Sequence, residues 1–244
     1  MNNKQQFLDW LIGFTEGDGS WFIRKNQTVG FEISQHSCDA SLLYLIKKYL
    51  GYGSVTHNSK ISISRYCLTK NQYNDIINKF NSRLKSNYRF YQFYSWCSFI
   101  HSNIDNTIDL NSITKDNSPI NFDNAWLSGF IDAEGCFRIA IDKTRPKLIF
   151  EISQKEIEIL QDIAKILSLK NNIRKDRNTY VLYTSDYFAR NKLINYLDKF
   201  PLKTKKLISY INWKKAHILD NQDPNYLDKI LKFKLNIHNN VKNI

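Results

Sequence analysis

Hydrophobic and polar positions follow the same order twice along the chain. In each half, one five-residue phrase, Phe-Glu-Ile-Ser-Gln, precedes an apolar stretch with helical spacing. An alternating segment typical of two paired strands follows, and then helical spacing returns. The pattern therefore predicts two repeats, each reading α-β-β-α-β-β-α, plus a terminal helix. These segments are residues 31–35, 40–50, 54–68 and 71–80 in the first half, and 150–154, 157–167, 173–184 and 187–200 in the second.

The composition changes between the two repeats. Residues 101–123 are rich in Asn, Asp, Ser and Thr and contain Pro119, which is typical of a linker. We therefore predict an N-terminal repeat at 1–100, a linker at 101–123 and a C-terminal repeat at 124–244.

A nine-residue phrase also occurs twice, as LIGFTEGDG from Leu11 and as LSGFIDAEG from Leu127. In helical register Gly13 and Gly17 share one face, and Gly129 and Ala133 share the corresponding face. Small residues at this spacing allow two helix backbones to approach closely. The phrase therefore predicts that two helices pack against each other.

If these helices pack together, their C-terminal ends meet and bring Asp18 close to Glu134. Two carboxylates beside backbone carbonyls suit a hard divalent cation such as Mg²⁺. The alternative is a pair of ordinary buried helices that end in glycine caps and carry solvated acids. The duplication of the phrase, with a similar strand pattern after each copy, favours the metal site.

The doubled phrase resembles the motif of the LAGLIDADG homing endonucleases, in the single-chain form with two repeats. The resemblance extends from about Phe7 to Trp213. It implies an α+β fold of two pseudo-symmetric αββαββα repeats. Each repeat would form a curved antiparallel sheet of a DNA-binding saddle, with the motif helices packed at its centre. The family also implies a monomer that binds double-stranded DNA.

The same resemblance implies the residues of the active site. Asp18 and Glu134 would be the metal-binding carboxylates, and the acids two positions earlier would be structural. The carbonyl groups of Gly17 and Ala133 would complete the metal ligands. Gln35 and Gln154 match a position that orders solvent around the scissile phosphates, and Lys205 matches a basic residue near the reaction centre. In the first half Asn87 takes the place of that lysine, and Lys85 or Arg89 could substitute only after a shift of the loop. The two active-site halves would then be unequal.

The implied reaction is hydrolysis of one phosphodiester on each DNA strand. Mg²⁺ between Asp18 and Glu134 would polarise the scissile phosphates and activate water for in-line attack, and Mn²⁺ or Ca²⁺ could replace it for binding. Lys205 would stabilise the developing negative charge. The expected products carry short 3′ overhangs, and the expected site is asymmetric and about 20 base pairs long, because each half would read about one turn of major groove.

The strands after each motif show a polar face that can read base edges in a major groove. The alternative is a sheet face that is simply exposed to solvent. The net positive charge of the chain, +12, and the doubled motif favour DNA binding. The predicted DNA-binding residues are Ser20, Phe22, Arg24, Asn26, Glu32 and Ser34 in the first half, and Arg138, Ala140, Asp142, Glu151, Ser153 and Arg174 in the second.

The chain carries a net charge of +12 with a pI near 9.4, which indicates a polyanionic partner. No apolar run is long enough to cross a bilayer, and residues 1–10 show no secretory or transit pattern. The abundance of Lys, Asn, Ile and Tyr reflects AT-rich codons, which would fit a mitochondrial intron and also other AT-rich genomes; outside the organelle the protein would be intracellular. The cysteines lack metal-binding spacing and read as reduced residues: Cys38, Cys67, Cys97 and Cys136.

Three other functions remain open at this point. An intron maturase of the same fold would bind structured RNA, with or without nuclease activity. A DNA-binding regulator without catalysis would be expected to lack one of the eighth-position acids, and both are present. Binding to a membrane surface is disfavoured, because the basic residues do not gather on one amphipathic face.

Overall fold

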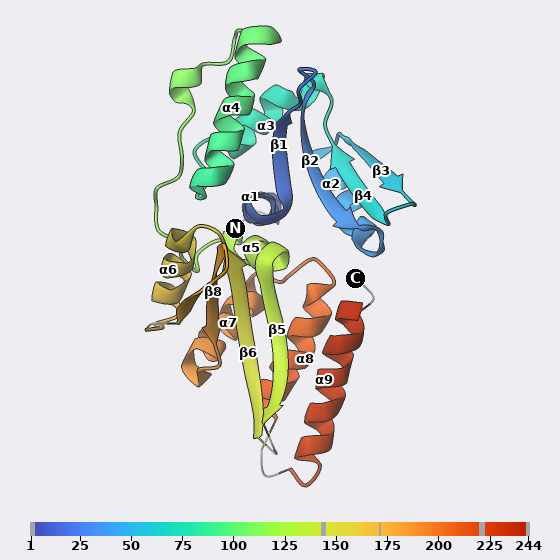
Figure 1. The fold of residues 1–244 in the computed structure, drawn as a ribbon, viewed down its shortest axis with the longest axis vertical. Coiled ribbons are helices and arrows are strands. Elements are labelled where there is room, and N and C mark those ends of the chain that lie inside the picture. Colours follow the sequence, from blue (N-terminus) through green and yellow to red (C-terminus); the bar gives the residue numbers. More distant parts are fainter. Residues whose placement is uncertain (1–2, 143–144, 171, 220–222, 243–244) are drawn as a thin grey trace. The chain divides into compact units, whose positions relative to one another are not determined.

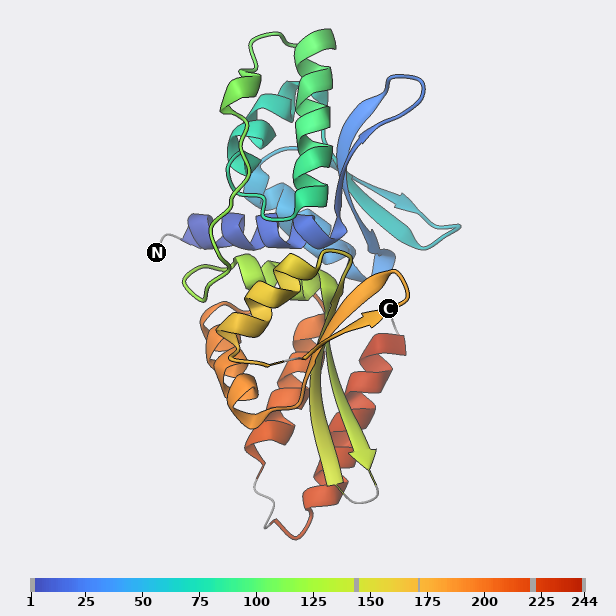
Figure 2. The ribbon, with the colours of Figure 1, turned by 60° about the vertical axis from the view of Figure 1, so that its left-hand side comes forward.

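The computed structural model describes residues 3–142, 145–170, 172–219 and 223–242 (Figures 1 and 2). The chain divides into two compact units. The first comprises the residues up to Pro119 together with Asp123–Ala133, and the second comprises Ile120–Phe122 and the residues from Glu134 onward. All of the second motif helix except its last residue, Glu134, therefore belongs to the first unit, whereas the sequence placed a boundary at 123/124.

The first unit holds a four-stranded antiparallel sheet in the order β1-β2-β4-β3. Its core forms where Trp21 of β1 pairs with Phe31 of β2 and packs on Phe80 and Phe93. The helices and strands are α1 (Asn3–Asp18), β1 (Gly19–Ile23), β2 (Val29–His36), α2 (Ala40–Leu50), β3 (Ser54–Asn58), β4 (Ile63–Cys67), α3 (Tyr73–Phe80), α4 (Asn87–Asn103) and α5 (Trp126–Glu134), with short turns η1 (Ser37–Asp39), η2 (Lys70–Gln72) and η3 (Leu110–Ser112).

The second unit repeats this plan with strand order β5-β6-β8-β7. Phe137 of β5 pairs with Phe150 of β6, in the register of Trp21 and Phe31, and packs on Tyr210 and Trp213. The elements are β5 (Gly135–Asp142), β6 (Arg145–Gln154), α6 (Ile157–Ile166), β7 (Ile173–Asp176), β8 (Thr179–Thr184), α7 (Tyr187–Lys199), α8 (Lys206–Ile218) and α9 (Tyr226–Lys242).

The predicted α+β fold with two matching antiparallel sheets is confirmed. Helix α2 has the predicted bounds because Leu42, Leu43 and Ile46 form one buried stripe, and because Gly51 ends the helix with a φ of 82°. A left-handed residue is a common helix C-cap, and glycine adopts it without a steric penalty.

Strand β1 is shorter than predicted, and the predicted strand positions of Arg24 and Asn26 are wrong. Both residues lie in the turn that joins β1 to β2. The N–H of Arg24 donates to the Thr28 carbonyl at 2.8 Å, and Gln27, with a φ of 63°, donates its N–H to the Arg24 carbonyl at 2.8 Å. Strand β1 therefore ends at Ile23, three residues earlier than the polar alternation to Asn26 suggests. By contrast, β5 extends to Asp142 as predicted.

Helix α4 runs to Asn103, so the predicted linker at 101–123 begins inside this helix. All four cysteines lie within the described ranges, and none of them is in a disulfide bond there. Within the described ranges, the structure contains no helix that is both long enough and apolar enough to span a membrane.

Candidate active site and nucleic-acid interface

The two motif helices are in backbone contact within the first unit. A Cβ atom added to Gly13 would overlap the carbonyl oxygen of Trp126, and one added to Gly129 would overlap the carbonyl oxygen of Trp10. In both cases the obstacle is backbone, which cannot rotate away as a flexible side chain can. The close packing predicted from the small residues is therefore confirmed.

Each motif helix also donates an indole hydrogen bond to the acid at the sixth motif position of the other helix. Nε1 of Trp10 on α1 donates to Oδ2 of Asp132 on α5 at 2.8 Å, and Nε1 of Trp126 on α5 donates to Oε1 of Glu16 on α1 at 2.9 Å. Glu16 and Asp132 are 1% and 3% exposed. Both acids are buried and hydrogen-bonded, as a buried carboxylate must be. This agrees with the structural role expected for the sixth motif position.

Glu16 also connects α1 to the start of α4. Its carboxylate accepts the backbone N–H of Lys85 at 2.8 Å and that of Ser86 at 2.5 Å. Burial raises the pKa of Glu16 to about 7, although these N–H donors and the Trp126 indole oppose the shift. One carboxyl group thus joins the two motif helices to the segment that precedes α4.

The C-terminal end of α1 is held by two further side chains. Gln35, at the end of β2, donates from Nε2 to Oδ2 of the half-buried Asp18 at 2.7 Å. Arg89, on the first turn of α4, donates from Nε to the carbonyl of Glu16 at 2.9 Å and from Nη2 to the carbonyl of Gly17. The structure therefore brings the predicted residues Asp18 and Gln35 together and adds Arg89.

The chemistry of this helix end suits a divalent cation at Asp18. An anionic carboxylate held by an amide is a ligand that Mg²⁺ accepts, and Mg²⁺ takes its other ligands from water and phosphates. Gly17 fits less well, because its carbonyl carries the Arg89 guanidinium and a second cation at that oxygen would be repelled. Among the described residues, no group of three or more His, Cys, Asp or Glu side chains could hold a metal.

The other predicted catalytic residues lie at the ends of elements. Glu134 is the last residue of α5 and follows Ala133, and Gln154 is the last residue of β6. Asp18 belongs to the first unit and Glu134 to the second, so their shared metal site stays a prediction. Lys205 is half-buried at the N-cap of α8, where its carbonyl accepts Nδ2 of Asn240 at 3.0 Å.

The aromatic contacts inside each unit suggest a correspondence between the basic residues of α4 and α8. Phe93 packs on Trp21 at a ring-centroid distance of 5.3 Å, and Tyr210 packs on Phe137 at 5.4 Å. If Phe93 corresponds to Tyr210, then Tyr88 corresponds to Lys205, and Arg89 corresponds to Lys206. The sequence placed Asn87 opposite Lys205, which is one residue away from this correspondence, although the loops before α4 (81–86) and α8 (200–205) are equally long.

Two lysines surround the start of α4 in the first unit. Nζ of Lys115, from the linker, donates to Oδ1 of Asn87 at 2.9 Å. Lys85 is engaged elsewhere, because its Nζ lies 2.7 Å from Oδ2 of Asp116. Lys115 was missed from the sequence, since it lies 28 positions from Asn87 and belongs to no motif.

The polar face of the first sheet carries four of the predicted DNA-binding residues on its strands. Ser20 pairs with Glu32, and Ser34 pairs with Arg65 of β4. Nε of Arg65 lies 4.0 Å from Oε1 of Glu32. Phe22 lies on the same strand face, and the Arg24 guanidinium stands over its ring at 4.7 Å.

The polar face of the second sheet forms an open hollow of about 620 Å³. Arg138 and Glu151 form an ion pair there, with Nη2 and Oε2 2.6 Å apart. The hollow also takes in the predicted residues Ala140 and Arg174, while Asp142 and Ser153 are exposed elsewhere on the strands. The remaining lining residues are Lys147, Ile149, Asn172, Ile173 and Tyr183.

Lys147, Tyr183 and Arg65 were not selected from the sequence. Nζ of Lys147 stands over the Tyr183 ring at 5.2 Å, which places a cation and an aromatic ring together. The strand register places each of them opposite a predicted residue. Lys147 pairs with Ala140, Tyr183 pairs with Glu151, and Arg65 pairs with Ser34.

Comparison with known proteins agrees with this architecture. The family model described as LAGLIDADG endonuclease matches residues 11–100 and again residues 127–217. Two solved structures share the fold at 19% identity: the I-LtrWI LAGLIDADG homing endonuclease bound to target DNA, with a TM-score of 0.76 over 95% of this chain and 97% of that one, and I-SmaMI bound to uncleaved DNA with calcium ions, with a TM-score of 0.73 over 95% and 98%.

Relatives by sequence are intron-encoded proteins of fungi. The chain is 34% identical to probable intron-encoded endonuclease 4 of Neurospora crassa, over 98% of this chain and 45% of that protein. It is 30% identical to an uncharacterized cox1 intron-2 protein of Schizosaccharomyces pombe, over 89% and 67%, and 28% identical to the intron-encoded RNA maturase bI4 of Saccharomyces cerevisiae, over 82% and 31%. The chain thus spans about one to two thirds of the length of these relatives. With the family model matching both repeats and the two motif helices in backbone contact, the chain belongs to the LAGLIDADG endonuclease family.

Proposed function

We propose that this protein is a site-specific homing endonuclease that cleaves double-stranded DNA as a monomer and requires Mg²⁺. The observation that carries the proposal is the backbone contact between two motif helices that each end in an acid, Asp18 and Glu134. A catalytically silent DNA-binding protein would have no need of both acids. The DNA-bound structures of the same fold support DNA as the partner.

In this proposal the two acids hold the metal, and their neighbours position them. Mg²⁺ bound there would supply the Lewis-acid charge that polarises a scissile phosphate and activates water. Gln35 orients the Asp18 carboxylate through its 2.7 Å hydrogen bond and can order solvent beside it. Lys205 would stabilise charge on the phosphate in its half, and Gln154 would act as Gln35 does. Mn²⁺ or Ca²⁺ would support binding, and calcium accompanies uncleaved DNA in I-SmaMI.

The two polar sheet faces would read an asymmetric site of about 20 base pairs, one half-site each, and cleavage would leave short 3′ overhangs. Arg138, Glu151 and Arg174 offer donors and acceptors in the second unit. Ser20, Glu32 and Ser34 do so in the first. Since relatives are intron-encoded proteins and one is a mitochondrial protein of Saccharomyces cerevisiae, we place the protein in the mitochondrion, encoded by the organelle.

A cleavage selection tests the proposal. The protein would be incubated with Mg²⁺ and a library of randomised duplexes, and the cut ends would be sequenced. We expect one long asymmetric site, loss of cutting in Asp18→Asn and in Glu134→Gln, and DNA binding by both variants. Asp228→Asn, at an exposed acid of α9, is the matched control and should cut normally. Normal cutting by Asp18→Asn or Glu134→Gln would refute the metal assignment.

The second candidate function is that of an intron RNA maturase, which the 28% identity to the Saccharomyces cerevisiae maturase supports. In that case the protein would promote splicing of the intron that encodes it. Splicing by Asp18→Asn, with no DNA site cut by the wild-type protein, would favour the maturase and reject the endonuclease. Cutting of a defined DNA site would establish the endonuclease whatever the splicing result.

A further inference from the structure

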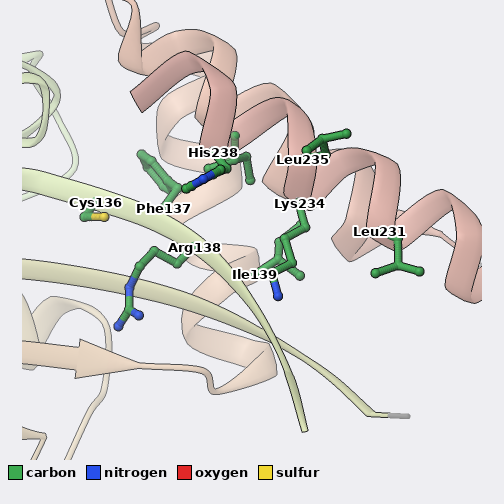
Figure 3. A pocket seen from close by; sticks show the side chains of 9 residues that line it. Cys136, Phe137, Arg138, Ile139, Leu231, Lys234, Leu235 and His238 are labelled. Atoms are coloured by element: carbon green, nitrogen blue, oxygen red, sulfur yellow. The ribbon is translucent and has the colours of Figure 1, made fainter. Parts of the chain in front are cut away.

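Helix α9 covers one flank of the second unit. It lies along the edge strand β5 and against α8, and Figure 3 shows Phe137 beside His238 at this boundary. Nδ2 of Asn236 donates to Oδ1 of Asn212 at 3.1 Å, and Nδ2 of Asn240 donates to Oγ of Ser209 at 3.0 Å. The apolar residues Ile230 and Ile237 of α9 are 0% and 6% exposed. An amphipathic helix thus completes this flank.

The first unit presents the same flank without such a helix. The edge strand β1 and helix α4 lie side by side as β5 and α8 do (Figure 1). If Phe93 corresponds to Tyr210, Gln92 and Ser95 correspond to Ser209 and Asn212, the residues that α9 contacts. Within 104–125, which the structure describes throughout, the chain after α4 forms only the short η3, and Ser112 of η3 contacts Asn81 in the loop before α4.

A groove of about 310 Å³ occupies this flank of the first unit. Ile23 is 42% exposed there, whereas the corresponding Ile139 beside α9 is 5% exposed, and Tyr91 is 67% exposed. Trp21 is 2% exposed, and its indole N–H has no hydrogen-bond partner among the described residues. Contiguous exposed apolar groups mark interaction surfaces. The groove is lined by Trp21, Ile23, Tyr88, Tyr91, Gln92 and Ser95.

The segments that border the groove contain no acidic residue. Neither Gly19–Ile23 nor Asn87–Asn103 carries Asp or Glu, and the exposed Lys25 follows β1 in the turn, whereas the Arg24 guanidinium stands over Phe22 on the opposite, polar face of the sheet. An acidic helix would complement this charge. The α9 helix of a second copy would not, because it presents Lys229, Lys232 and Lys234.

We propose that the groove between α4 and β1 is a docking site for an amphipathic α-helix of a protein partner. The helix would insert its apolar face between Tyr91 and Ile23, as α9 does beside β5. Its polar side chains would reach Gln92 and Ser95, and acidic residues would flank its apolar face. This binding mode, an apolar helix face in a groove, is a general one for protein partners.

The test uses the full chain and a synthetic peptide based on α9. The peptide has the sequence of residues 226–242 with Glu in place of Lys229, Lys232 and Lys234, and carries a fluorophore. We expect binding by fluorescence anisotropy in the micromolar range, weakened by salt. The Tyr91→Ala variant should bind it at least tenfold more weakly. Tyr94→Ala is the matched control, because Tyr94 is 39% exposed on the same helix but does not line the groove, and it should bind as the wild type does.

Three results would overturn the proposal. The first is no binding of the acidic peptide by a folded wild-type protein. The second is peptide binding that neither Tyr91→Ala nor Ile23→Ser weakens. Two variants are measured so that one remains informative if the other fails to fold. The third is photocrosslinking of position 91 to single-stranded RNA in a protein that does not bind the peptide. This surface would then bind nucleic acid rather than a protein helix. Crosslinking of the peptide at position 91, lost on competition with unlabelled peptide, would confirm the site.

Discussion

Adding a single methyl group between the motif helices tests the packing most directly. In an exposed helix Gly→Ala stabilises by about 1 kcal/mol. At Gly13 the new Cβ would overlap the Trp126 carbonyl, so α1 and α5 must separate. Overpacking of this kind costs roughly 3 kcal/mol at the upper end of its usual range, because backbone rather than a side chain must move. We therefore expect Gly13→Ala to lose about 2 kcal/mol net.

For a protein of this size, that loss lowers the melting temperature by about 4–8 °C. Differential scanning calorimetry would measure it, with Ser41→Ala, at an exposed position of α2, as the control. Gly129→Ala should cost about the same, and the double variant less than the sum, since the helices separate only once. Gly13→Leu and Gly129→Leu should cost more. A melting temperature that is unchanged or higher in Gly13→Ala would refute the backbone contact.

Three further predictions concern charge, catalysis and pH. If Arg24 and Arg138 read bases, Arg24→Ala and Arg138→Ala should each cost about 1–3 kcal/mol in DNA affinity and relax the base preference at one position of their own half-site. Binding to a set of DNA-site variants measures both effects. A uniform loss of affinity would indicate a phosphate contact, and no loss would remove that arginine from the interface. Lys205→Met should slow DNA cleavage strongly and Asn87→Ala only slightly. If the two strands are cut at different rates, a nicked plasmid should appear transiently in a time course. Unchanged rates of nicking and linearisation in Lys205→Met would show that this lysine is a solvated residue without a catalytic role. Because burial raises the pKa of Glu16 from 4.5 to about 7, its contribution to stability is complete below pH 4.5 and is lost as the pH rises to about 7; the free energy of unfolding of the wild type relative to Glu16→Gln should fall over that range, and a constant difference would contradict the raised pKa.

The elements and the motif contact could be predicted because they depend on local pattern. Periodicity marks α2, and the small faces of the doubled motif mark the approach of α1 to α5. The turn at Arg24 could not be found, since polar alternation continues through a tight turn and only the positive φ of Gln27 shows where the strand ends.

The surroundings of Asp18 were only partly predictable. Gln35 could be found because it lies in a repeated phrase. The sequence indicated Arg89 only as a substitute for the missing lysine and did not indicate Lys115, because each reaches its partner across a long stretch of chain that no motif spans. Arg89 lies on the first turn of α4 and Lys115 lies beyond the end of that helix, so their contacts depend on tertiary packing rather than on local pattern.

The crossed indole–carboxylate bonds have a consequence for how such a chain can be rebuilt. Each motif copy supplies one donor and one acceptor, so the interface is isologous: what Trp10 does for Asp132, Trp126 does for Glu16. A surface of this kind accepts a copy of itself. Two first motifs facing each other would place Trp10 opposite Glu16 twice and keep both bonds. Each motif helix therefore carries both the donor and the acceptor that this pairing needs, so a duplicated motif helix would bring a complete set of bonding groups.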